Sequence, residues 1–133
     1  MGEFIKQIEE STNQKQNANE KLFTLIKMHF EQLSADYHLA IVTQLELRQS
    51  NYDLRIQINN VLKRYLTVLD NILKEGIQQQ LFRDDLTIPL VRQMIFGTLD
   101  EIVTNWVMNE QKYDLNKQVP AVHDLLMKGL SVD

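Results

Sequence analysis

Residues 54–73 read LRIQINNVLKRYLTVLDNIL, and this stretch decides the fold. Its large apolar residues recur at intervals of three and four, the spacing that gathers side chains on one face of an α-helix. These residues are Leu54, Ile58, Val61, Leu62, Tyr65, Leu69, Ile72 and Leu73. The pattern predicts a long amphipathic helix that begins near Asn51 or Tyr52. It should end at Gly76 or in the turn shortly after it.

Three further helices are expected before this one. The first covers residues 2–11 and is followed by a polar loop over residues 12–17. The second starts at Asn17, which together with Glu20 resembles a capping box, and continues to about residue 34. A third helix can be capped by Asp36 and carries its own apolar residues.

Two more helices are expected after the long one. Thr87 as N-cap and Pro89 in the first turn open a helix that runs to about residue 109. The last covers about residues 117–130, with Pro120 near its first turn. Both helices are apolar over more than one stripe, so either a partner subunit or the chain's own core covers the extra surface. The sequence thus predicts one all-α domain of about six helices, residues 1–133.

Composition excludes several classes of protein. The net charge is −4 and no run of Lys and Arg is concentrated anywhere, which argues against DNA contact by this segment. No apolar run approaches the ~20 residues of a membrane-spanning helix. The first residues do not form a secretory signal, and cysteine is absent. We therefore expect a cytoplasmic chain that neither enters a membrane nor forms disulfides.

The sequence predicts neither a metal site nor catalysis. His29, His38 and His123 fall in separate expected helices without a second ligand at suitable spacing, so each is interpreted as a surface or structural residue. Asp100 and Glu101 are adjacent, and neighbouring helical residues point about 100° apart, which hinders joint acid–base action on one centre. No serine lies in a nucleophile motif. We expect no enzyme and no cofactor.

Large apolar residues offer a binding role instead. They are Phe23, Met28, Phe30, Tyr65, Met94, Phe96 and Trp106. Such side chains can line an elongated pocket between helices, or they can simply fill the core, which is the simpler interpretation. Gly97, inside the expected helix over residues 87–109, suggests a place where another backbone or a ligand approaches closely.

Two segments carry a resemblance to a known family. Residues 39–51 read LAIVTQLELRQSN, and residues 92–101 read RQMIFGTLDE, continuing through TNWVMN (104–109) to QKYDL (111–115). Between them, residues 65–66, 69–70 and 75–78 fit the same register. On these residues the chain resembles the TetR-family repressors of fatty-acid degradation in Bacillus-type bacteria, across nearly its whole length.

The resemblance implies a ligand-binding and dimerisation domain over residues 1–133. The helix-turn-helix domain that contacts DNA in this family would be absent from this chain, so DNA would be bound only through that missing N-terminal domain. Two copies would form a homodimer through their last two long helices, in a four-helix interface. We expect the interface to include Val91, Ile95, Ile102, Val122, Leu125 and Leu126.

The resemblance also implies a long-chain acyl-CoA effector that releases the full-length protein from DNA by population shift. At ~0.8 kcal/mol per buried methylene, an acyl chain of about fourteen carbons supplies on the order of 10 kcal/mol before binding costs. The expected acyl tunnel consists of Met28, Leu45, Tyr65, Leu69, Phe96, Leu99 and Trp106. The basic candidates for the CoA phosphates are Arg48, Arg55, Lys63, Arg64 and Arg92, which could instead be solvated or paired with Glu46 and Asp53.

Other readings of the same residues remain open. The fold could hold a different small apolar ligand, such as a drug or a signal molecule, which would not need a basic pocket mouth. The chain could also be a structural helical dimer without a ligand. An acyl-CoA-processing enzyme would need a nucleophile or base that the sequence does not offer.

Overall fold

The computed structural model describes residues 2–36, 52–110 and 112–132. Its elements are α1 (Gly2–Asn13), α2 (Ala18–Ala35), α4 (Tyr52–Gln78), α5 (Ile88–Met108), the 3₁₀ turn η1 (Leu115–Gln118) and α6 (Val119–Leu130). No strand occurs among the described residues, and the prediction of an all-α chain is confirmed. The helix expected after Asp36 lies outside the described residues.

The ends of α1 and α2 follow local hydrogen bonding. Asn17 is the N-cap of α2, and its Oδ1 accepts from the Glu20 backbone N–H at 2.9 Å, as predicted. The Glu20 carboxylate accepts from the Gln16 N–H at 3.2 Å, one residue earlier than in a standard capping box. α1 continues to Asn13, two residues beyond the predicted end, and within it Thr12 donates its hydroxyl to the Ile8 carbonyl at 2.9 Å.

α4 ends two residues beyond Gly76, at Gln78, and Gln80 then adopts a left-handed φ of 62°. Both the Leu81 and Phe82 N–H groups donate to the Gly76 carbonyl, at 2.9 and 3.0 Å. The Phe82 ring is folded back onto the helix, where a Cβ on Gly76 would come within 2.1 Å of it. Gly76 is therefore needed for this close approach of the Phe82 ring, which turns the chain towards α5.

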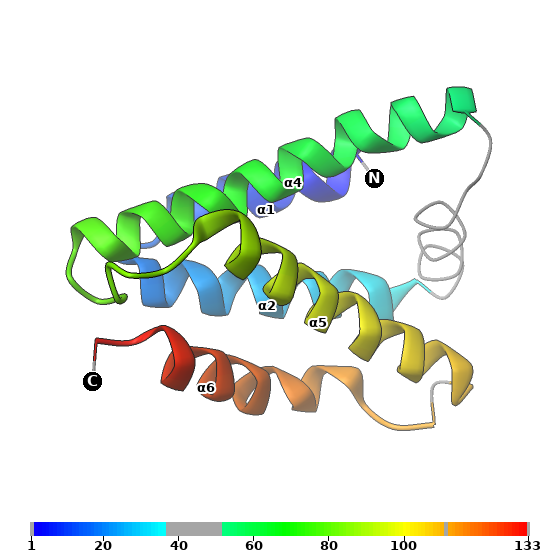
Figure 1. Ribbon diagram of the computed structural model, residues 1–133. Helices are drawn as coiled ribbons and strands as arrows, with labels where there is room; N and C mark the ends of the chain where they lie inside the picture. The colour runs from blue at the N-terminus through cyan, green and yellow to red at the C-terminus, as the bar shows by residue number, and fades with distance from the viewer. Residues whose placement is uncertain (1, 37–51, 111, 133) are drawn as a thin grey trace.

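α2 is the central helix of the molecule. It contacts α1, α4, α5, α6 and η1, and Figure 1 shows it crossing the middle of the bundle with α4 on one side and α6 on the other. Its buried face meets buried residues of α4 and α5. The core on these helices comprises Leu22, Leu25, Ile26, Phe30, Leu33, Tyr65, Leu69, Ile72, Leu73, Ile95, Leu99, Val103 and Trp106. The stripe predicted on α4 is thus buried from Tyr65 onward.

The last helix is tied back to the turn between α4 and α5. Residues Leu115–Gln118 form η1 instead of the first turn of α6, because Asp114 caps them by accepting from the Asn116 N–H at 3.0 Å. At the other end, the Arg83 N–H donates to the Leu130 carbonyl at 2.8 Å, and Phe82 pairs with Ser131 in an isolated antiparallel bridge. These bonds fix the C-terminal end of α6 to the turn that follows α4.

Candidate functional site

A buried hydrogen bond joins α2 to α4 in the core. His29 Nδ1 and Tyr65 Oη lie 2.8 Å apart, and both side chains are almost wholly buried. The Tyr65 ring meets Phe96 of α5 edge-on, with the ring centroids 5.4 Å apart. A polar pair therefore sits where α2, α4 and α5 come together.

Burial keeps this pair uncharged. It lowers the pKa of the His29 imidazole from 6.5 to about 4, and it raises the pKa of the Tyr65 hydroxyl. A neutral imidazole carries one N–H donor and one acceptor nitrogen, and the tyrosine hydroxyl can both donate and accept. The pair thus has two polar hydrogens, and only one of them can lie between Nδ1 and Oη.

Sequence reasoning did not place His29 in any site. The available signal was its position in α2: it follows Leu22 and Leu25 by seven and four residues, and precedes Leu33 by four. This spacing puts it on the buried face of the helix. A histidine among core residues needs a hydrogen-bond partner, but the sequence does not name Tyr65 as that partner.

The residues expected in an acyl tunnel lie in or against the core. Tyr65, Leu69, Leu99 and Trp106 are 0–5% exposed, and Met28 and Phe96 pack against them while half-buried. Leu45 is outside the described residues. Because protein interiors are closely packed, an acyl chain would reach these positions only if side chains move apart.

Trp106 has a further structural role. Its indole Nε1 donates to the Tyr113 carbonyl at 2.8 Å, and the Tyr113 hydroxyl accepts from the Asn105 side chain at 3.2 Å. The end of α5 is thereby fastened to the segment that leads into η1.

Two of the basic candidates are paired within the chain. Arg92 Nη1 lies 2.8 Å from Asp70 Oδ2, and Arg64 pairs with Glu9 of α1. Lys63 is exposed. Arg48 and Glu46 lie outside the described residues, as do the side chains of Arg55 and Asp53. The structure therefore gives Arg64 and Arg92 carboxylate partners other than those considered from the sequence.

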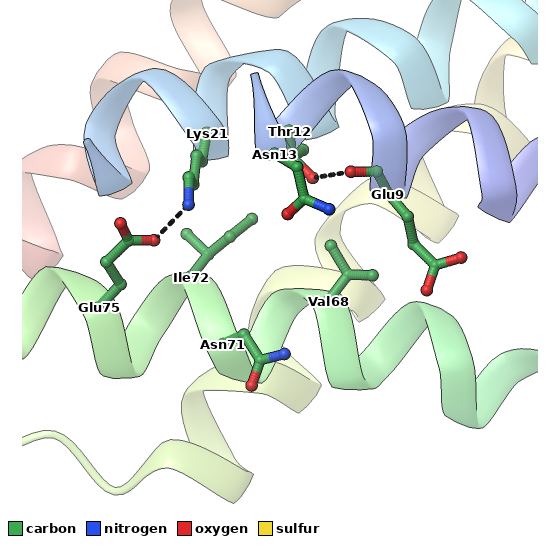
Figure 2. A pocket seen from close by; sticks show the side chains of 8 residues that line it. All are labelled: Glu9, Thr12, Asn13, Lys21, Val68, Asn71, Ile72 and Glu75. Carbon is green, nitrogen blue, oxygen red and sulfur yellow. Dashed lines mark hydrogen bonds and ion pairs between the residues drawn. The ribbon is translucent and has the colours of Figure 1, made fainter. Parts of the chain in front are cut away.

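A small polar pocket of about 130 Å³ lies between α1, α2 and α4. Figure 2 shows Lys21 of α2 reaching across to Glu75 of α4, with Nζ 2.7 Å from Oε2. The lining residues are Glu9, Thr12, Asn13, Lys21, Val68, Asn71, Ile72 and Glu75. None of these had been expected in a site. Because Glu9 and Glu75 are both paired with cations, the pocket has little net charge to attract an ion.

α5 and α6 present apolar side chains to solvent. Leu90, Met94, Met108 and Leu125 are between 54% and 77% exposed in the single chain. Of these four, only Leu125 had been expected at a dimer interface; the expected residues Val91, Ile102, Val122 and Leu126 are half-buried. Ile95 differs: it is 1% exposed and packs inside its own chain, because it points to the core face of α5 with Leu99.

Gly97 lies on open surface of α5. A Cβ on Gly97 would meet nothing within 4 Å among the described residues, so no close packing within the chain explains this glycine. Gly129 of α6 is open in the same way. Both glycines lie on exposed surface of the two helices that carry the exposed apolar residues.

The part of the chain that the structure describes offers neither a metal site nor a membrane-spanning helix. No group of three or more His, Cys, Asp or Glu side chains there is arranged to hold a metal ion. None of its helices is both long and apolar enough to cross a membrane.

Known proteins match this chain along nearly its whole length. Residues 1–129 match the family model described as YsiA-like protein, C-terminal region. The fatty acid metabolism regulator protein of Bacillus subtilis (strain 168) is 55% identical over 130 residues, which are 98% of this chain and 67% of that protein.

Two solved structures share the fold. The crystal structure of the transcriptional regulator FadR from Bacillus subtilis in complex with stearoyl-CoA has a TM-score of 0.90 at 55% identity, covering 96% of this chain and 69% of that chain. The fatty acid degradation regulator FadR from Bacillus halodurans also has a TM-score of 0.90 at 55% identity, covering 96% of this chain and 66% of that chain. The chain spans about two thirds of the length of these regulators. It belongs to the family of YsiA-like C-terminal regions, with the TetR-type helical fold of the fatty-acid regulators.

Proposed function

We propose that residues 1–133 form the effector-binding and dimerisation region of a TetR-type repressor of fatty-acid degradation. The effector is a long-chain acyl-CoA, and the full-length protein binds DNA through an N-terminal domain outside this chain. The observation that carries the proposal is the likeness, at 55% identity and a TM-score of 0.90, to a regulator whose crystal structure is a complex with stearoyl-CoA.

The acyl chain would be buried between α2, α4 and α5. The proposed lining residues are Met28, Leu45, Tyr65, Leu69, Phe96, Leu99 and Trp106. Those among them that the structure describes belong to one continuous apolar core or pack against it, which supports this location. Burial of each methylene contributes about 0.8 kcal/mol, so the site would favour long chains.

The CoA phosphates would meet Arg48, Arg55, Lys63, Arg64 and Arg92. For Arg64 and Arg92 this requires an exchange of partners, because each already pairs with a carboxylate of the chain. A phosphate is a suitable replacement, since guanidinium groups bind phosphate oxygens in the same forked geometry.

A homodimer would form through α5 and α6, in a four-helix interface. The exposed side chains of Leu90, Met94, Met108 and Leu125 support this surface, because apolar residues in one patch favour association. Val91, Ile102, Val122 and Leu126 would complete the contact. The open surface at Gly97 and Gly129 would let a partner helix approach closely.

The chain would act as a regulator and not as an enzyme, in line with the names of the similar proteins, and it would do so in the cytoplasm. Binding would act on DNA affinity only if the ligand binds two conformations of the full-length protein unequally.

Thermal unfolding of the 133-residue chain tests the ligand. Stearoyl-CoA should raise the midpoint progressively with concentration, because a ligand that binds only the native state adds RT ln(1 + [L]/Kd) to stability. At a hundredfold excess over Kd this is about 2.7 kcal/mol. Free CoA and stearate at equal concentrations should leave the midpoint unchanged.

An unchanged midpoint with stearoyl-CoA, at all concentrations below its micellar range, would contradict the acyl-CoA proposal. The same assay with neutral or cationic drugs then tests a sensor of another ligand. If no ligand changes the unfolding midpoint and the chain still dimerises, the chain is a structural helical dimer without a ligand.

A further inference from the structure

The His29–Tyr65 pair is a polar contact in the apolar core of the bundle. Its two residues are 36 positions apart in sequence, on α2 and α4, and the Tyr65 ring lies beside Phe96, a proposed tunnel residue. Two apolar side chains of similar shape could fill the same space with little loss of stability, because the net contribution of a buried hydrogen bond is small. The pair therefore calls for a role besides packing.

The acyl-CoA ligand has one polar group that must leave water when its tail is buried. This group is the thioester carbonyl, which joins the apolar chain to the pantetheine. A carbonyl without a donor in an apolar site weakens binding, since its hydrogen bonds to water are lost. A tunnel for acyl-CoA thus gains from one uncharged hydrogen-bond donor next to its apolar walls.

Tyr65 can supply that donor without becoming charged. When His29 Nδ1 carries the ring hydrogen, it donates to Tyr65 Oη, and the hydroxyl hydrogen of Tyr65 is then directed to another acceptor. The low pKa of His29 keeps the ring neutral, so a change of tautomer is sufficient and no ion is buried. The edge-on contact of the two rings places Tyr65 beside Phe96, along the proposed path of the acyl chain.

We propose that Tyr65 donates its hydroxyl hydrogen to the thioester carbonyl of bound acyl-CoA, and that His29 positions Tyr65 by donating to its oxygen. The inference rests on the proposed function and adds to it how the site distinguishes an acyl thioester from an alkyl chain of equal length. Tyr65 is the binding residue, and His29 is a positioning residue.

The test compares palmitoyl-CoA with S-hexadecyl-CoA, in which a methylene replaces the carbonyl. Calorimetric titration of the wild-type chain should give about tenfold tighter binding of the thioester, equivalent to about 1.4 kcal/mol. Tyr65→Phe should bind both ligands with the affinity that the wild type has for the thioether. His29→Leu should lower the thioester preference as well, because Tyr65 loses its fixed orientation.

Tyr113→Phe is the matched control, because it removes a hydroxyl from an exposed tyrosine outside the proposed tunnel. It should keep the tenfold preference. The thioether affinity of Tyr65→Phe also reports on folding, since a collapsed tunnel would lose both ligands. If that variant binds neither, the infrared band of carbonyl-¹³C-labelled palmitoyl-CoA in the wild-type chain decides: a hydrogen bond shifts it to lower wavenumber than in hexane.

The outcomes distinguish a failure of the thioester contact from a failure of the proposed function. If the wild type binds both ligands equally, or if Tyr65→Phe keeps the preference, the thioester contact is wrong and the acyl-CoA site stands. An infrared band at its hexane position also overturns the contact. If the wild type binds neither ligand, the proposed function itself fails.

Discussion

The Phe82 ring packs directly on the backbone of Gly76, where a Cβ would lie 2.1 Å from Phe82 Cδ2. Gly76→Ala should therefore destabilise the chain by about 1–3 kcal/mol, since the ring or the turn must shift. The gain of about 1 kcal/mol from the better helix propensity of alanine does not offset this. Urea denaturation followed by circular dichroism measures the difference.

Gly97→Ala is the control for this substitution. Its Cβ would meet nothing within 4 Å among the described residues, so the substitution adds no clash inside the chain. At concentrations where the chain is monomeric, the helix-propensity gain should raise the free energy of unfolding by about 1 kcal/mol. A Gly76→Ala chain as stable as wild type would contradict the steric account. Weaker dimerisation of Gly97→Ala would place the proposed partner helix at this glycine.

The neutral state of His29 predicts a dependence of stability on pH. Its pKa is about 4 in the folded chain against 6.5 unfolded, so between these values the unfolded state binds more protons. The contribution of neutral His29 to the free energy of unfolding should be fully present above pH 6.5. It should fall by about 1.4 kcal/mol per pH unit as the pH drops towards 4. The total loss is on the order of 3 kcal/mol.

Denaturation curves at pH 7, 5.5 and 4.5 test this dependence. His29→Gln, which keeps a donor and an acceptor but does not titrate, should flatten the slope of stability against pH. His123→Gln is the comparison, because the pKa of His123 is also lowered by burial, though that ring is only half-buried. An unchanged slope in His29→Gln would assign the acid sensitivity to other groups.

Two substitutions test the placement of the acyl tunnel. Leu69→Trp adds bulk at a fully buried position and should abolish the stabilisation by palmitoyl-CoA, while Phe96→Ala should weaken it by removing apolar contact. Dimerisation should be intact in both. Thermal shift with palmitoyl-CoA is the measurement. Should both variants respond like wild type, the tunnel lies elsewhere.

The dimer is tested at the 74% exposed Leu125 of α6. Leu125→Glu should dissociate the dimer, because an unpaired carboxylate would be buried in the interface. The mass in solution should then fall from twice 15.6 kDa to the 15.6 kDa of one chain. Sedimentation velocity gives the mass. Thr67→Glu introduces the same charge on the exposed face of α4 and should leave the dimer unchanged. If both variants dissociate the dimer, or if neither does, the dimer interface is not the α5–α6 surface.

The helices themselves could be predicted from the sequence. The cap at Asn17, the apolar stripe ending at Leu73 and the opening of α5 next to Pro89 were each signalled by residues within one or two turns. Such signals are reliable because helical hydrogen bonds join residues four apart. The two segments that resemble fatty-acid regulators also indicated the family, and the matches along nearly the whole chain confirm it.

Only the tertiary structure decided which buried residues meet. Periodicity places His29 and Tyr65 on apolar faces, but the bond between them depends on how α2 crosses α4. The same holds for Arg92, whose Asp70 partner is 22 residues away, and for Ile95, which is buried in the core of its own chain. The physical reason is that a helix forms from local contacts, whereas partners across helices are set by the packing of the whole bundle.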